Sequence, residues 1–101
     1  MVEKYFRDRK IRKIIREITS LIKKETARNI KRGLVEHAMG FILVEGIVKL
    51  DLSARQIELL KENESLFIKA FEKKRKDTEI ELRYEENLLY VEYVVCIDTL
   101  K

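Results

Sequence analysis

The chain has 101 residues, of which 46% are hydrophobic and 40% are charged, and its formal net charge is +4. This composition excludes an intrinsically disordered chain, and the length allows one modest hydrophobic core, so we expect a single folded domain over residues 1–101. The single cysteine excludes an internal disulfide, and no Cys/His cluster has the spacing of a structural zinc site. With neither a secretory signal nor a long apolar run, we expect an intracellular, cytoplasmic protein without a transmembrane segment. Only four side-chain amides among many ion-forming residues suggest a heat-adapted source.

The clearest pattern is a stripe of isoleucines near the N-terminus. They recur at spacings of three, four and seven residues, as on one face of an amphipathic helix: Ile11, Ile14, Ile15, Ile18 and Ile22. We expect this helix over residues 8–32, because Gly33 can adopt the left-handed conformation that follows a helix. Lys31 and Arg32 also suit the negative end of the helix dipole. Residues 1–7 are expected to form a short edge strand or an ordered arm.

A strand is expected over residues 41–52, where β-branched and apolar residues dominate. Gly46 lies inside this segment. A glycine within a strand marks either a bulge or a close approach by a neighbouring group.

A second helix is expected over residues 54–76. Ser53 followed three residues later by Gln56 is a capping-box pattern, in which each side chain satisfies a free amide at the helix start. The buried stripe of this helix is expected to contain Ile57, Leu60, Phe67, Ile68 and Phe71. Because Glu64 falls within the stripe, either the helix breaks near residues 63–65 or Glu64 lies at the exposed edge.

From Thr78 the apolar period changes to two, which predicts a C-terminal β-hairpin over residues 78–97. A two-residue turn at Glu86–Asn87, with Asn87 supplying the positive backbone angle, fixes the register. It places Leu82 opposite Val91, Ile80 opposite Tyr93, and Glu81 opposite Glu92. The outer face of this hairpin then carries more apolar area than a solvated strand normally does, from Leu88, Tyr90, Val94 and Cys96.

Together these elements predict an α+β fold, with two amphipathic helices packed on a small sheet that ends in an antiparallel hairpin. Charge is segregated along the chain. Residues 1–32 hold twelve Lys or Arg against four acids, a net of +8, whereas residues 77–101 carry a net of −5.

The basic segment motivates the first functional hypothesis, a non-enzymatic module that binds DNA or RNA. Six cations lie opposite the isoleucine stripe and are the expected binding residues: Arg9, Arg12, Lys13, Arg16, Lys23 and Lys24. Such a face can neutralise backbone phosphates and release their counterions. Residues 73–76 extend the patch if the fold brings them near. The competing interpretations are a solvated helix face, a face paired with the acidic hairpin, and, least favoured, a helix lying on a membrane surface.

The second hypothesis is a homo-oligomeric interaction protein whose subunits meet through the apolar outer face of the hairpin. An enzyme ranks third. His37 is the only histidine and has no nucleophile near it in sequence, and Cys96 is expected to be a packed strand residue. The carboxylates Asp51, Glu79, Glu81 and Glu92 have no distinctive spacing, so neither a catalytic nor a metal site and no cofactor is predicted.

Overall fold

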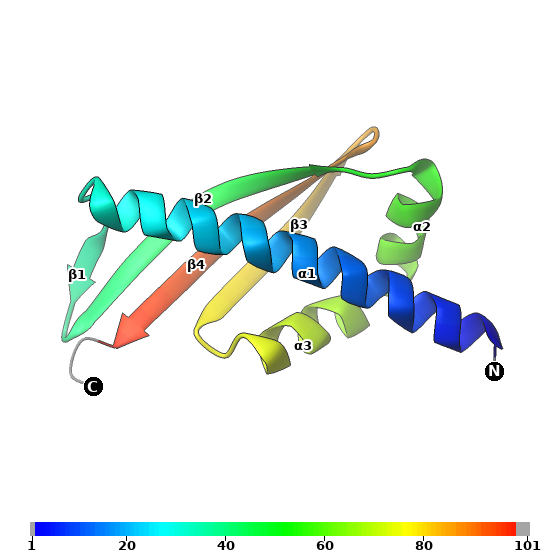
Figure 1. Cartoon of the computed structure of the whole chain (residues 1–101), viewed down its shortest axis with the longest axis horizontal. Coiled ribbons are helices and arrows are strands. Elements are labelled where there is room, and N and C mark those ends of the chain that lie inside the picture. Colours follow the sequence, from blue (N-terminus) through cyan, green and yellow to red (C-terminus); the bar gives the residue numbers. More distant parts are fainter. Residues whose placement is uncertain (1, 99–101) are drawn as a thin grey trace.

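The computed structural model describes residues 2–98, with side chains from residue 9 onward. It contains three helices and one four-stranded antiparallel sheet in the order β1-β2-β4-β3 (Figure 1). The helices are α1 (Val2–Lys31), α2 (Ala54–Glu62) and α3 (Glu64–Lys74); the strands are β1 (Glu36–Ala38), β2 (Phe41–Asp51), β3 (Thr78–Glu85) and β4 (Leu88–Asp98). The α+β class and the C-terminal hairpin are confirmed.

Helix α1 crosses the sheet diagonally and buries its whole isoleucine stripe (Figure 1). It ends as predicted at Gly33, which has a φ of 74°. The amide of Gly33 donates to the carbonyl of Ile30 and that of Leu34 donates to the carbonyl of Asn29, which together form a Schellman cap. The expectation of a strand or arm is wrong for residues 2–7, because the helix already begins at Val2, while Met1 lies outside the described residues. No glycine or proline interrupts this polar first stretch, so the helix extends beyond its apolar stripe.

The predicted helix over residues 54–76 is two helices. Its start is confirmed, since Ser53 and Gln56 form both hydrogen bonds of the capping box, at 2.9 and 3.2 Å. The chain then breaks at Asn63, the first of the two alternatives that Glu64 raised, and α3 ends at Lys74 rather than at residue 76. Phe67 and Phe71 of α3 are buried in the core, as Ile57 and Leu60 of α2 are, whereas Glu64 at the break stays partly exposed.

Strand β2 pairs with β4 along its full length in one uninterrupted register, so the bulge considered at Gly46 is wrong. Gly46 lies opposite Tyr93, and a Cβ atom at this position would collide with the Tyr93 ring and the Glu25 carboxylate. The glycine therefore marks a close approach, made by two side chains rather than by another backbone.

The hairpin of β3 and β4 has the predicted register, including the Glu81–Glu92 pair. The positive backbone angle, however, belongs to Glu86, with a φ of 51°, and not to Asn87. Asn87 instead presents its carbonyl to the backbone N–H of Leu52 at 2.9 Å, which ties the turn to the end of β2.

All the buried apolar side chains form one core between the helices and a single face of the sheet. The strand residues in this core alternate along each strand, as Val44 and Val48 do in β2 and Val91 and Val95 do in β4. Within residues 2–98 the opposite face of the sheet, called the outer face below, has no helix over it.

Candidate nucleic-acid interface

The six cations predicted from the sequence are all exposed, and their positions place them on the side of α1 that faces away from the sheet. Burial of the isoleucine stripe fixes this orientation, because side chains about half a turn away must then point to solvent. Arg9, Arg16 and Lys23 follow one another at seven-residue intervals. They form a line about 21 Å long at 1.5 Å per residue. Arg12 lies beside this line, and Lys13 and Lys24 lie on the neighbouring flank.

A polar hollow lies between α1 and the end of α3. It is lined by Arg16, Thr19, Ser20, Lys23, Lys74 and Arg75 and is called the basic groove below. Residues more than fifty positions apart in sequence supply its two walls. The expectation that residues 73–76 extend the basic patch therefore holds for Lys74 and Arg75, whereas Lys73 and Lys76 lie outside the groove.

Besides the buried isoleucine stripe, a hydrogen bond from Tyr93 to Glu25 joins α1 to the sheet. The Tyr93 hydroxyl donates to Oε1 of Glu25 at 2.6 Å, and only 2% of Tyr93 is exposed. Burial, reinforced by this bond to a carboxylate, raises the pKa of Tyr93 well above its ordinary value. Tyr93 therefore stays protonated and able to donate throughout the neutral pH range. Its partner Glu25 lies two residues after Lys23 in α1, so this hydrogen bond fixes the helix close to the basic groove.

Three of the four cations that line the basic groove have no ion-pair partner among the described residues, and the fourth, Arg75, is paired. In the described part of the chain the ion pairs are Arg75–Asp77 and Arg83–Glu92, both at 3.6 Å. Arg16, Lys23 and Lys74 have no carboxylate within 4.0 Å among these residues. The interpretation in which the basic helix pairs with the acidic hairpin of its own chain is thus not realised there, because the hairpin carboxylates lie on the outer face.

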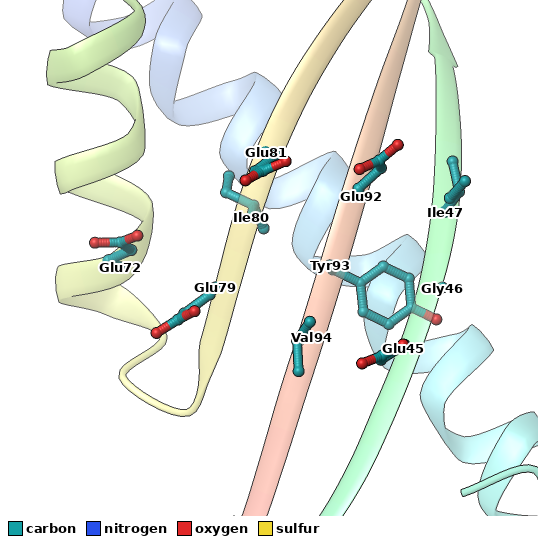
Figure 2. A pocket seen from close by; sticks show the side chains of 10 residues that line it. All are labelled: Glu45, Gly46, Ile47, Glu72, Glu79, Ile80, Glu81, Glu92, Tyr93 and Val94. Atoms are coloured by element: carbon teal, nitrogen blue, oxygen red, sulfur yellow. The ribbon is translucent and has the colours of Figure 1, made fainter. Parts of the chain in front are cut away.

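The outer face is acidic. Glu45 of β2, Glu79 and Glu81 of β3, and Glu92 of β4 project from it around Val94, and α1 lies behind the strands (Figure 2). The protein therefore has a cationic helical side and an anionic sheet side. A polyanion would be attracted to the first and repelled by the second.

The remaining candidate residues do not assemble into a second site. His37 is exposed on β1, and Cys96 is half-buried on β4. No group of three or more His, Cys, Asp or Glu side chains within residues 2–98 is placed to hold a metal ion. The same stretch contains no helix with the length and apolarity needed to cross a membrane.

Thr19 and Ser20 also line the basic groove, although neither was predicted from the sequence; Ser20 is exposed, whereas the Thr19 hydroxyl is buried. Both lie between Arg16 and Lys23 on the helix, so the seven-residue spacing of the two cations was the available signal.

Searches of protein-family models, curated proteins and solved structures found no match to this chain.

Proposed function

We propose that this protein binds nucleic acid through its phosphate backbone, using the exposed face of α1 and the basic groove. The observation that carries the proposal is the meeting of Arg16 and Lys23 of α1 with Lys74 and Arg75 from the end of α3. Two separate basic segments converge on one hollow, and a merely solvated helix face has no need of such convergence.

The chemistry of the groove suits phosphate. Arg, Lys, Ser and Thr side chains are common donors to phosphate oxygens in protein–DNA complexes, and they fix position without reading the base sequence. The basic groove offers Arg, Lys and Ser donors and no aromatic side chain, whereas the Thr19 hydroxyl is buried. The expected binding is therefore sequence-independent and dominated by charge.

The dimensions set the size of the interaction. Helix α1 is about 45 Å long at 1.5 Å per residue. The line from Arg9 to Lys23 covers about 21 Å, or roughly six base pairs at 3.4 Å per step. Six to eight cations can reach phosphates. On duplex DNA, the logarithm of the binding constant is therefore expected to fall linearly with the logarithm of salt concentration, and the magnitude of the slope is expected not to exceed about 5 to 7.

The test is fluorescence anisotropy with labelled single- and double-stranded DNA and RNA at low salt. The variant Arg16→Glu/Lys23→Glu reverses two groove charges and is expected to weaken binding at least about a hundredfold. The matched control Arg55→Glu/Lys69→Glu makes the same change of net charge at exposed positions outside the groove. It is expected to retain most of the affinity. Absence of binding to all four nucleic acids, or equal losses in both variants, would contradict the proposal.

A further inference from the structure

The outer face of the sheet carries half-buried apolar side chains with no helix of the described chain over them. Leu88, Tyr90, Val94 and Cys96 all project from β4 on this side, and Ile47 on β2 is 49% exposed. These are the residues that the sequence marked as needing a cover. A β-sheet with one apolar, uncovered face is commonly completed by a second sheet about 10 Å away.

The charges on this face form rows that cross the strands. One row contains Glu45, Val94 and Glu79; the next contains Ile47, Glu92 and Glu81; the third contains Lys49, Tyr90 and Arg83. Acids therefore flank Val94 on both sides, and cations flank Tyr90 on both sides. The two outer rows lie about 7 Å on either side of the middle row, because side chains on one face repeat every second residue.

Two copies can stack these faces about a twofold axis in two simple ways. An axis parallel to the strands keeps each row in place and exchanges β2 with β3, so Glu45 meets Glu79 of the second copy and Lys49 meets its Arg83. Every such pair has like charges and is unfavourable. An axis perpendicular to the strands, along the middle row, instead exchanges the two outer rows.

In this second arrangement the charges of the two outer rows each meet an opposite charge. Glu45 faces Lys49 of the second copy and Glu79 faces its Arg83, and the symmetry makes four such pairs in all. Along β4, Val94 packs on Tyr90 and Cys96 packs on Leu88. Placing the axis on either neighbouring row brings acids opposite acids or leaves the cations without partners.

We propose that a second copy of this chain covers the outer face, in a symmetric dimer whose twofold axis runs perpendicular to the strands along the row of Ile47, Glu92 and Glu81. Strands β2 and β4 are about 37 Å long and β3 is about 27 Å long; at about 4.7 Å per strand they provide roughly 500 Å² per copy, or about 1,000 Å² in total. That area is near the lower limit of specific interfaces. The dimer is therefore expected to dissociate in the micromolar range.

The arrangement has two unfavourable contacts on the axis, and one of them helps to test it. Glu81 meets Glu81 and Glu92 meets Glu92 of the second copy, although Arg83 of the same chain lies 3.6 Å from the Glu92 carboxylate and offsets part of that repulsion. Replacing the Glu92 carboxylate by an amide removes the Glu92–Glu92 repulsion at similar volume. Glu92→Gln is therefore expected to tighten the dimer.

The dimer also has a consequence that rests on the proposed nucleic-acid binding. Because the sheets face each other, the two α1 helices lie on opposite outer sides of the assembly. Each carries its own basic groove. One dimer then joins two nucleic-acid segments, whereas a monomer binds one.

Sedimentation equilibrium without nucleic acid, from about 5 to 500 μM protein, tests the dimer independently of that function. Lys49→Glu and Glu45→Lys, both at exposed positions, are each expected to raise the dimer dissociation constant about tenfold or more, because symmetry applies each change twice. The double variant Glu45→Lys/Lys49→Glu keeps the wild-type net charge. It is expected to restore the constant to within about threefold, since each new Lys again faces a Glu.

Several results would overturn the dimer. The axis parallel to the strands predicts the opposite sign, because Lys49→Glu would then face Arg83 and Glu45→Lys would face Glu79, so both variants would tighten association. An interface of about 1,000 Å² is expected to give a dissociation constant in the micromolar range, so a wild-type protein that is still monomeric at about 500 μM also contradicts the dimer. So does a double variant that is no tighter than the single ones.

Energy transfer between two differently labelled duplexes tests the bridging. Wild type is expected to bring them together, while Lys49→Glu still binds one duplex but does not bridge. If the dimer forms and neither protein binds DNA, the proposed function fails and the dimer stands. If wild type dimerises and binds but does not bridge, the outward placement of the two grooves is wrong.

Discussion

Gly46 occupies a position where the structure allows no larger side chain, and Gly46→Ala tests the packing that places α1. A Cβ atom there would lie 2.5 Å from the Tyr93 hydroxyl oxygen and 2.7 Å from the ring carbon that bears it, with the Glu25 carboxylate closer still. Since Tyr93 is only 2% exposed, a shift of its ring must displace side chains packed around it.

Three contributions set the expected size of the effect. Overpacking costs about 1–3 kcal/mol, and loss of the hydrogen bond to the charged Glu25 costs about 1.5–3 kcal/mol. Replacing a glycine within a strand by alanine, taken alone, raises the free energy of unfolding by about 0.5–1 kcal/mol. Gly46→Ala is therefore expected to lower the free energy of unfolding by about 2–5 kcal/mol, whereas alanine would stabilise an ordinary strand position.

Urea unfolding followed by circular dichroism measures this difference. Tyr93→Phe removes only the hydrogen bond and is expected to cost about 1.5–3 kcal/mol. The double variant should cost less than the sum of the two, because the same bond is lost once. Tyr90→Phe, on the outer face, is the matched control and is expected to change stability by less than about 0.5 kcal/mol. A Gly46→Ala protein as stable as wild type would refute this account of how α1 is positioned.

Two further predictions concern pH and the start of α2. Burial, with the negative charge of Glu64 adding to it, raises the pKa of Tyr84 to about 12, and burial also raises the pKa of Tyr93. Because these folded-state values exceed the unfolded value near 10, stability is expected to be retained up to about pH 10 and to fall as pH rises toward 12. Unfolding measured from pH 8 to 11.5 should show a shallower decline in Tyr84→Phe/Tyr93→Phe. Ser53→Ala removes the capping box and is expected to lower the free energy of unfolding in urea by about 1 kcal/mol. The control Ala54→Ser, at the neighbouring exposed position, is expected to change it by less than about 0.5 kcal/mol.

Local patterns were sufficient where a single periodicity determines the structure. The isoleucine stripe fixed which face of α1 is buried, and therefore which cations are exposed. The alternating pattern of β3 and β4 and the two-residue turn fixed the hairpin register. In each case a shift by one residue would have exposed the apolar set, so only one arrangement was compatible with the sequence.

Other features depended on contacts between distant segments. The break at Asn63 was one of two alternatives that the sequence left open, because Phe67 and Phe71 are expected to be buried in both. The left-handed residue of the hairpin turn is Glu86, and the carbonyl of Asn87 accepts a hydrogen bond from Leu52, which directly follows β2 and is far from the turn in sequence. The meeting of Lys74 with Lys23 in the groove depends on where α3 lies against α1, which no local pattern encodes.

The most direct test of the proposed function is the salt dependence of binding to duplex DNA, compared between wild type and Arg16→Ala/Lys23→Ala. If these side chains contact phosphates, the magnitude of the slope of log K against log salt is expected to fall by about 1.8 in the variant, because each lost contact removes about 0.9. An unchanged slope would mean that the groove does not touch the backbone. No measurable binding by wild type at low salt would contradict the account altogether.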